Sequence, residues 1–421
     1  MKLVWLSHFI PFPPHGGSRQ RSFNLIRHIS AKYETHLIAL NMQNATPERA
    51  AESSAELGKY CAEVQIWEPP YPWRGLRWWA QLALSPLYPQ PYGCRALWSP
   101  ELDRRWRGAL GQHPGALVHF DSIDLALYAP AARGFRKVLN HHNCESAMAE
   151  RRAEKEPNPL KRAYLRQQAR KLRRLEQRLC HQFDVNLTVS ELDMQTLRER
   201  NPQAHCHVVE NGTDTEYFHP TKTAPEPNTL VFAGGLNWYP NVSGIRFFVR
   251  EVWPILKVRC PGIRLYLAGR SPAPEVVRLA GSDPAIELIA DPVDIRPWIW
   301  KAAVFVCPII DGGGTRLKIL DALAMGKAVV STSIGCEGLE VKPGENLLVA
   351  DTPQEFATQI LRLLDDDDLR KQLAVNGRVL VEHDYSWRMI GRHLQQAYGC
   401  GSGSGGCLFG PKRPRPADRS V

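Results

Sequence analysis

A chain of 421 residues with 43% hydrophobic and 23% charged residues has the length and composition of a globular protein of two or three domains. No apolar run approaches the roughly 20 residues that span a bilayer, and the start of the chain reads as a first strand rather than a signal peptide, which predicts a cytoplasmic protein. The ten cysteines have neither metal-ligand nor disulfide spacing, and the net charge of +10 is not accompanied by a nucleic-acid-reading motif, so we expect neither a bound metal nor a nucleic-acid partner.

Short apolar strands alternate with helices through the first half of the chain. A helix is predicted over Arg21–Ile29, after a loop that contains Gly16 and Gly17. The predicted strands are Lys2–Ser7, Thr35–Leu40, Val64–Trp67, Leu117–Phe120, Val138–Asn140 and Val185–Thr188. This alternation predicts a parallel, doubly wound sheet.

A long basic helix is predicted near the end of this half. Eleven Lys and Arg residues lie between Arg151 and Arg178, with an apolar stripe that runs from Leu160 to Leu179. The segment before it is rich in tryptophan, at Trp67, Trp73, Trp78, Trp79, Trp98 and Trp106. Such elements are typical of a protein that rests on an anionic bilayer, here the inner face of the cytoplasmic membrane. A solvated helix face and core tryptophans are the alternative, and both interpretations stay open.

The pattern restarts after the proline-rich run at Pro220–Asn228, which predicts a domain boundary. A helix is predicted over Ser243–Leu256, with strands at Thr229–Ala233, Ile263–Ala268 and Ala303–Cys307. Two such sheets, each with a glycine loop after a strand, predict two Rossmann-like domains that face a cleft. The Gly/Ser-rich and then Pro/Arg-rich residues 399–421 predict a disordered tail.

The stretch from Pro308 to Thr332 combines a glycine loop with the start of a helix. Gly312 to Gly314 follow a buried strand, Thr315 is predicted to be the helix N-cap, and Gly326 fits the helix end. The first amides of such a helix and its dipole favour anions.

Charged side chains strengthen this anion prediction. Arg316 and Lys318 add positive charge beside the loop, and the carboxylate of Asp321 follows one helical turn later. The block therefore predicts a phosphate or diphosphate site, whereas an ordinary turn between a strand and a helix is the alternative.

Four motifs in this order resemble the group 1, family 4 glycosyltransferases. They are Val209–Pro220, which resembles the family's interdomain NG-x-D-x-x-x-F-x-P pattern, Leu230–Gly235, Pro308–Leu339 and Tyr385–Tyr398. The third is similar to a subset associated with bacterial exopolysaccharide assembly. The resemblance covers nearly the whole chain up to Tyr398.

This resemblance implies an α/β GT-B fold of two Rossmann-like domains. Residues 1–215 would bind the acceptor, residues 216–384 the nucleotide-sugar, and residues 385–398 would form a helix that returns to the N-terminal domain. The implied activity is retaining transfer of a sugar from a nucleotide-sugar to a glycan or lipid-linked acceptor, with no metal or other cofactor.

Stabilisation of the departing nucleotide diphosphate is the main chemical demand on such a site. We expect Arg316, Lys318 and the backbone of Gly313, Gly314 and Thr315 to meet it from the donor side, and Gly16 and Gly17 from the other domain. The family normally places an arginine and a lysine after the first donor-domain strand. Here Gly235 and its neighbours stand there, and Arg316 and Lys318 are interpreted as substitutes.

The family also has two glutamates eight positions apart, and here these positions are Gly313 and Asp321. An aspartate can still accept hydrogen bonds from ribose hydroxyls. Loss of the first glutamate leaves a second hypothesis open, a catalytically silent scaffold of a polysaccharide assembly complex. A dinucleotide-dependent oxidoreductase is disfavoured because no strand is followed by GxGxxG with an acidic residue about 20 positions later.

Candidate acceptor-side residues follow two strands of the N-terminal sheet. His119 and Asp121 end one strand near the place where the family often has a histidine, and either would orient an acceptor hydroxyl or the transferring sugar. His142, Asn143 and Glu145 follow the next strand and face the same cleft if the predicted topology holds. A structural role is the alternative for each.

Overall fold

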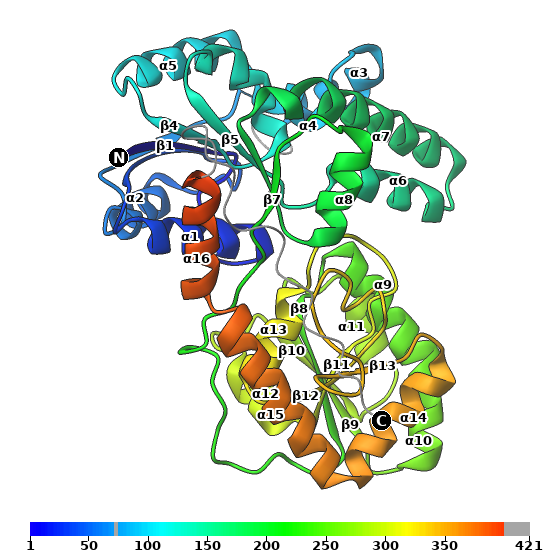
Figure 1. Cartoon of the computed structure of the whole chain (residues 1–421). Helices are drawn as coiled ribbons and strands as arrows, with labels where there is room; N and C mark the ends of the chain where they lie inside the picture. The colour runs from blue at the N-terminus through cyan, green and yellow to red at the C-terminus, as the bar shows by residue number, and fades with distance from the viewer. Residues whose placement is uncertain (71–74, 400–421) are drawn as a thin grey trace.

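The computed structural model describes residues 1–70 and 75–399. Trp73 and residues 400–421 of the predicted tail lie outside the described residues. The chain forms two parallel β-sheets flanked by helices, one above the other in Figure 1. This architecture confirms the prediction of two Rossmann-like domains.

The N-terminal sheet has seven strands, and its central members are buried on both faces. Its order is β3 (Glu63–Trp67), β2 (Glu34–Leu40), β1 (Lys2–Ser7), β4 (Leu117–Phe120), β5 (Arg136–Asn140), β6 (Val185–Thr188) and β7 (Cys206–Val208). Burial on both faces explains why these strands read as continuous apolar runs. The polar residues that follow β1, β4 and β5 therefore meet at one edge of the sheet. Strand β7 was not predicted.

Eight α-helices and three 3₁₀-helices of the described residues cover this sheet. They are α1 (Gly17–Ile29), α2 (Pro47–Leu57), α3 (Leu76–Leu84), η1 (Ser85–Leu87), α4 (Tyr92–Leu97), α5 (Pro100–Gly111), η2 (Ile123–Ala132), α6 (Glu145–Lys155), α7 (Pro159–Leu179), η3 (Cys180–Gln182) and α8 (Glu191–Arg200). Asn158 caps the predicted basic helix α7 by accepting hydrogen bonds from the amides of Leu160 and Lys161. Leu160 does not belong to the packed stripe, because it is 82% exposed at the helix start.

The tryptophans before α7 are mostly core residues. Trp67, Trp78 and Trp106 are buried, whereas Trp79 is 53% exposed. The interpretation of this whole segment as interfacial is therefore wrong for the three buried rings.

The C-terminal sheet has the order β10 (Ile286–Ala290), β9 (Arg264–Arg270), β8 (Thr229–Gly235), β11 (Val304–Cys307), β12 (Ala328–Ser331) and β13 (Leu348–Val349). Its helices are α9 (Tyr239–Phe247), the π-helix η4 (Phe248–Val252), α10 (Trp253–Arg259), α11 (Pro274–Ala280), α12 (Arg296–Lys301), α13 (Leu317–Ala324), α14 (Pro353–Asp365) and α15 (Asp367–Asp384). The single helix predicted over Ser243–Leu256 is interrupted by η4. Pro254 supplies the reason, because it has no N–H to continue the α-helical hydrogen bonds. Strands β10 and β13 were not predicted.

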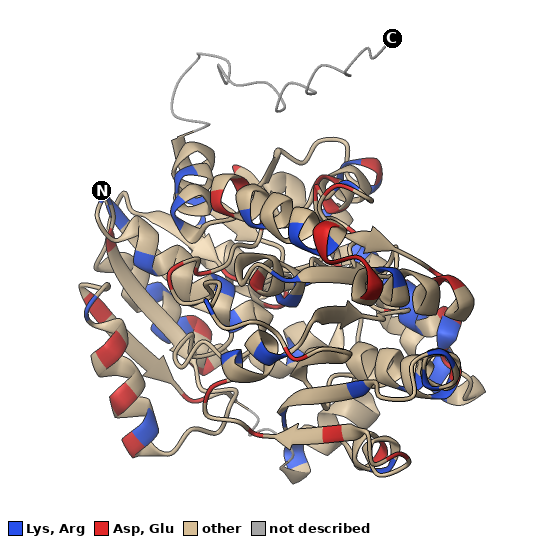
Figure 2. Cartoon of the chain, turned by 90° about the horizontal axis from the view of Figure 1, so that it is seen from below, with Lys and Arg blue, Asp and Glu red and all other residues tan. Residues whose placement is uncertain are grey.

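Helix α16 (Trp387–Gly399) returns to the N-terminal domain and packs on α1 (Figure 1). A Cβ added at Gly391 would lie only 2.7 Å from Cβ of His28, so glycine permits this close contact. The return lies beside the first crossing between the domains, since Thr213 forms a parallel β-bridge with Ser386. Basic and acidic residues are interleaved on the helices of both domains (Figure 2).

Candidate functional site

Two helices, one from each domain, begin at glycine loops that lie against each other. α1 follows Gly16, with φ +93°, and α13 follows Gly312 and Gly314, with φ +99° and +73°. A Cβ added at Gly17 would lie 3.4 Å from Cδ1 of Leu317. No side chain caps either helix. Their first N–H groups therefore remain available to an anion between the domains.

Thr315 is not the N-cap of α13, as the sequence predicted. Arg316 occupies that position, and no side chain bonds to the first helical amides. The hydroxyl of Thr315 instead accepts a 2.6 Å hydrogen bond from Nδ2 of Asn211, in the segment that joins the domains. The prediction fails because this hydroxyl is engaged across the domain boundary.

The guanidinium of Arg316 turns back on its own loop. It donates hydrogen bonds to the carbonyl oxygens of Gly313, of Gly314 at 2.5 Å and of Asp311 at 3.3 Å. Burial lowers its pKa. The side chain therefore holds the shape of the loop, whereas the sequence predicted that it contacts the departing diphosphate.

Lys318 places its ammonium group at the carboxyl end of β8. Nζ donates a 2.7 Å hydrogen bond to Oδ1 of Asn241 and lies 4.0 Å from the ring centre of Phe232. A Cβ added at Gly234 would lie 2.8 Å from this Nζ. Burial lowers the pKa of Lys318 to about 8. The ammonium group of Lys318 thus lies at the end of β8, where the residues that follow this strand supply no cation.

Further basic side chains from both domains gather beside Gly16. Burial, together with the charges of Arg270 and Arg19, lowers the pKa of His15 to about 4. Arg270 ends β9 opposite Gly235 of β8, where the family normally places its donor-side cations. Within residues 1–70 and 75–399, neither arginine forms an ion pair with a carboxylate. The sequence analysis did not assign Arg270, although a cation at the end of a buried strand was a usable signal.

Asp321 lies on α13 and contacts the crossing between the domains. Its Oδ1 accepts a 2.6 Å hydrogen bond from the hydroxyl of Thr213, and burial raises its pKa to about 7. The side chain is therefore not a solvent-facing helix residue. It places a carboxyl group one helical turn from the glycine loop.

Asp121 lies at the centre of a buried polar network at the carboxyl ends of β1, β4 and β5. It accepts hydrogen bonds from Ser7 at 3.3 Å, Ser22 at 2.5 Å and Asn140 at 2.7 Å, and Nε2 of His142 lies 3.3 Å from it. Burial by itself raises the pKa of this carboxyl, but the neighbouring histidines outweigh it and hold the pKa well below its usual range. Asp121 is 0% exposed, so it positions His142 rather than facing the cleft itself.

His119 is separated from the glycine loops by its packing. It is 0% exposed and stacks on Trp5, with 3.6 Å between ring centres, and its Nδ1 forms a 2.7 Å hydrogen bond with the hydroxyl of Tyr398. Burial lowers its pKa. The ring fixes α16 to the N-terminal sheet, and the structure does not bring it to the surface of the site.

The start of α6 lies directly against the glycine loop. A Cβ added at Gly314 would lie 2.1 Å from Oδ1 of Asn143 and 3.6 Å from the carbonyl oxygen of His142. Asn143 also donates a 3.2 Å hydrogen bond to Glu145, whose pKa is raised to about 8 by burial and by nearby carboxylates. The predicted acceptor-side residues and the donor loop are therefore neighbours, and Gly314 is required for their close approach.

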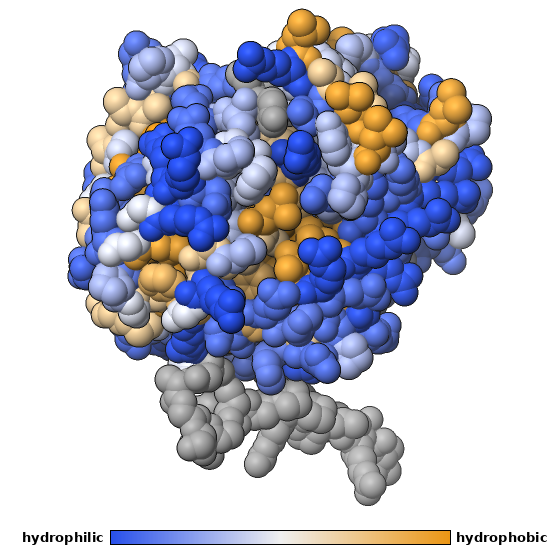
Figure 3. Space-filling view, turned by 90° about the horizontal axis from the view of Figure 1, so that it is seen from above, coloured by the Kyte–Doolittle hydropathy of each residue, from blue (hydrophilic) through white to orange (hydrophobic). Residues whose placement is uncertain are grey.

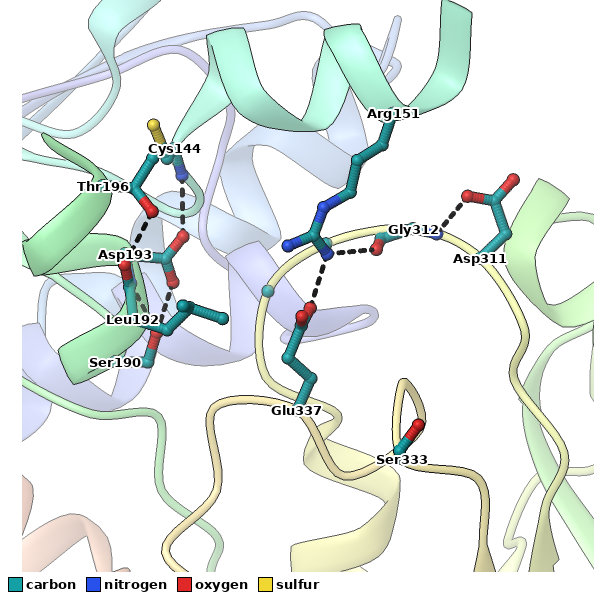
Figure 4. Close-up of polar contacts among 12 residues, drawn as sticks. Cys144, Arg151, Ser190, Leu192, Asp193, Thr196, Asp311, Gly312, Ser333 and Glu337 are labelled. Carbon is teal, nitrogen blue, oxygen red and sulfur yellow. Dashed lines mark hydrogen bonds and ion pairs between the residues drawn. The ribbon is translucent and has the colours of Figure 1, made fainter. Parts of the chain in front are cut away.

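Ion pairs along α6 hold the two domains together. Arg151 contacts Glu337 at 2.6 Å and donates a 3.5 Å hydrogen bond to the carbonyl oxygen of Gly312 (Figure 4). One turn later, Lys155 lies 3.7 Å from Asp311. These contacts were not predicted, because a basic helix in a sequence does not reveal which acidic loop it meets.

One group in the described part of the chain has the spacing to hold a metal ion. His36, Glu63 and His113 place ligand atoms within 4.8 Å of one another. They lie at or before the amino ends of β2, β3 and β4, at the edge of the sheet opposite the glycine loops. This group is therefore separate from the candidate site.

Two family models match consecutive parts of this chain. The model described as Glycosyltransferase Family 4 matches residues 15–217, and that described as Glycosyl transferases group 1 matches residues 227–366. An uncharacterized 44.6 kDa protein in the cps region of Klebsiella pneumoniae is 30% identical over 168 residues, 38% of this chain and 43% of the relative. An alpha-maltose-1-phosphate synthase of Mycolicibacterium smegmatis is 26% identical over 219 residues, 46% of this chain and 56% of the relative. The chain thus spans about half the length of these curated relatives.

Solved structures share the fold over nearly the whole chain. Sucrose-phosphate synthase from Thermosynechococcus elongatus has a TM-score of 0.72 at 18% identity, covering 95% of this chain and 98% of that one. HepE from Anabaena in complex with UDP has a TM-score of 0.64 at 13% identity, covering 95% and 100%. These similarities confirm the two-domain fold predicted from the sequence.

Proposed function

Since this chain belongs to the group 1 glycosyltransferases and has their GT-B fold, we propose that it transfers a hexosyl group from a nucleotide-diphosphate sugar to a glycan or lipid-linked acceptor. One observation carries this proposal. The uncapped helices α1 and α13 meet between the domains, with Lys318, Arg19 and Arg270 beside them.

The positive groups match the chemistry of the leaving group. A departing nucleotide diphosphate gains negative charge, and N–H groups and cations that are already in place stabilise it without reorganisation. Lys318 and the start of α13 supply this charge, so we propose a reaction that needs neither a bound metal nor another cofactor. The family resemblance supports retention of configuration at the transferred sugar.

The remaining site residues divide between donor and acceptor. Asp321 is proposed to accept hydrogen bonds from the ribose, in competition with Thr213. On the other side, Glu145 has a pKa of about 8 and holds a proton near neutral pH, so it can donate a hydrogen bond. Residues 1–215 would form the acceptor domain, residues 216–384 the donor domain, and residues 385–398 the returning helix.

The related proteins support a role in bacterial surface polysaccharide or exopolysaccharide biosynthesis. One relative comes from a cps region, one is named for maltose-1-phosphate synthesis, and HepE is described in complex with UDP. We therefore propose a UDP-sugar as the first donor to test, and a cytoplasmic site of action.

Peripheral contact with an anionic membrane is part of this proposal. No helix of the described residues is both long and apolar enough to cross a bilayer. The outer face of α7 instead exposes four arginines, Arg166, Arg170, Arg173 and Arg174. Lys171 does not belong to this face, because its Nζ donates a 2.7 Å hydrogen bond to the carbonyl oxygen of Ser85. Each cation near an anionic surface contributes about 1 kcal/mol.

Replacing these four arginines by glutamine should weaken sedimentation with phosphatidylserine vesicles and flatten its salt dependence. Equal sedimentation of wild type and variant would exclude the membrane role. Stabilisation by UDP should survive in the variant, because the donor loop lies on the other domain.

Thermal unfolding with UDP and GDP, followed by mass spectrometry on a nucleotide-sugar panel, tests the enzymatic proposal. A nucleotide that binds the folded protein raises its melting temperature. A catalytically silent scaffold is the second candidate, since Gly313 stands where the family has a glutamate. The scaffold is supported if no nucleotide stabilises the protein and no nucleotide-sugar is hydrolysed, and this result would overturn the enzymatic proposal.

A further inference from the structure

A cavity of about 290 Å³ lies in the N-terminal domain, beneath α3. Its walls come from the ends of β1 and β2 and from α3, α4 and η2, and they are mainly apolar. The lining residues include Phe9, Met42, Trp78, Ala96 and Leu97. This volume is close to the lower limit of about 300 Å³ for ligand pockets, and it suits a short apolar group.

The polar lining residues are His8, Gln43, Tyr92 and Asp124, and none of them carries a positive charge at pH 7. Gln43 is already paired with the backbone of Ile10, and burial raises the pKa of the Asp124 carboxyl only to about 6, so this group is largely ionised at pH 7 and repels free phosphate. Nδ1 of His8 and the hydroxyl of Tyr92 are buried without a hydrogen-bond partner among the described residues. Burial and the neighbouring His142 lower the pKa of His8 to about 4, so this ring is neutral at pH 7. The other six lining residues are hydrophobic residues or glycine, so a free sugar would leave part of its hydroxyls unsatisfied there. The cavity therefore favours hydrocarbon over glycan or free phosphate.

Aromatic rings connect the cavity with the protein surface. Trp78 lines the cavity, and its ring centre lies 5.9 Å from that of Tyr92 and 4.6 Å from that of Trp79, which is 53% exposed. Further exposed apolar residues surround this end of the domain, at Leu76, Leu84, Leu87 and Leu160. Figure 3 shows hydrophobic surface interspersed with hydrophilic surface on the upper face of this domain.

The basic helix α7 borders this apolar surface. Its Tyr164 forms a 3.0 Å hydrogen bond with Ser85 of η1, and Gln167 donates one of 3.1 Å to the carbonyl oxygen of Pro86. Exposed leucines and tryptophan beside exposed arginines match the apolar and anionic layers of a bilayer surface.

The other side of the cavity leads toward the donor loop. The ring of His8 lies 5.9 Å from that of His142, whose carbonyl oxygen is 3.6 Å from a Cβ added at Gly314. A molecule in the cavity would therefore lie between the membrane-facing surface and the predicted sugar-transfer site.

We propose that this cavity binds the hydrocarbon segment next to the head group of a lipid-linked acceptor, while the rest of the lipid passes α3 toward the bilayer. The inference rests on the proposed glycosyltransferase function and selects a lipid-linked acceptor over a free glycan. Apolar burial in the cavity provides affinity, and the position of the cavity directs the head group toward the glycine loops.

Binding of geranyl phosphate to the full chain, measured by calorimetry below its aggregation concentration, tests this assignment. Ala96→Phe fills the cavity from α4, and Met42→Trp fills it from the end of β2. Ala51→Phe on the exposed face of α2 is the matched control. We expect wild type and control to bind geranyl phosphate and each filling variant to bind it at least tenfold more weakly. Inorganic phosphate, which has only the donor site to occupy, should bind more weakly than geranyl phosphate and equally to all four proteins.

The proposal is overturned if wild type does not bind geranyl phosphate, or if a folded filling variant binds it as tightly as wild type. Equal binding of inorganic phosphate and geranyl phosphate would also overturn it, because the hydrocarbon of geranyl phosphate would then contribute nothing to its affinity. UDP-induced stabilisation, measured on the same proteins, keeps the two proposals apart. If cavity-dependent binding occurs without a response to any nucleotide, the donor assignment fails and the lipid site stands.

Discussion

Replacement of Lys318 by methionine tests the donor site most directly. Methionine keeps much of the apolar volume and removes the ammonium group. Hydrogen bonds to charged groups contribute about 1.5–3 kcal/mol. Since 1.4 kcal/mol is a factor of ten in affinity, we expect the variant to bind its nucleotide roughly ten- to 150-fold more weakly.

Although Lys318→Met should weaken nucleotide binding, it should not lower the stability of the nucleotide-free protein. Burial lowers the pKa of Lys318 from its ordinary value of 10.5 to about 8 in the folded protein. At 1.36 kcal/mol per unit, keeping this group protonated costs about 3 kcal/mol. Because the unfolded chain holds the proton to higher pH, this cost is present below pH 8 and disappears between pH 8 and 10.5. The methionine variant should therefore be at least as stable as wild type at pH 7.

Calorimetric titration with UDP from pH 7 to 9.5 gives the decisive result. Wild-type affinity should fall as Lys318 loses its proton above pH 8, whereas the weaker affinity of Lys318→Met should not show this fall. Lys327→Met is the matched control, because burial also lowers the pKa of Lys327 to about 8 while its Nζ donates to the carbonyl oxygens of Trp300 and Ala302. Equal nucleotide affinity of wild type and Lys318→Met, with both folded, would refute the phosphate role.

Two further changes have signs that follow from burial. Asp321→Asn should stabilise the protein at pH 8 by up to about 4 kcal/mol. Burial raises the pKa of Asp321 from 3.8 in the unfolded chain to about 7 in the folded protein, so the stability of the wild type falls as pH increases between these two values. Urea unfolding at pH 4 and pH 8 checks this, and a gain of equal size at both pH values would contradict it. Tyr398→Phe should cost about 1–3 kcal/mol, because it leaves Nδ1 of buried His119 without its partner; unchanged urea unfolding would show that α16 is not fixed through this contact.

Most of the fold was predictable because parallel strands buried on both faces leave an unambiguous apolar signature. Strand β4, with all four residues buried, was predicted at its observed bounds. Strand β10 has only its first residue buried, and β13 has two residues, so neither produces a recognisable run. Interruptions such as η4 depend on how a proline inside a helix is accommodated.

The local chemistry of the site was predictable, but its long-range contacts were not. Glycines before α1 and α13 signal helix starts that bind anions, and the structure brings Gly17 beside Leu317. A sequence does not show that Arg316 bonds to its own loop, or that Lys318 reaches the end of β8. These differences depend on side-chain directions set by packing between elements far apart in the chain.

The departures from the family pattern become intelligible when the site is viewed as one set of charges. The cations missing after β8 are replaced in space by Lys318, whose ammonium bonds to Asn241 of α9. At Gly313, Met148 of α6 lies 3.4 Å from an added Cβ, so a larger side chain there would be in van der Waals contact with α6. The same helix begins with Glu145, a buried carboxyl group that is largely protonated near neutral pH. The positive charge lost after β8 is thus supplied by Lys318 of α13, which favours a working donor site over a silent scaffold.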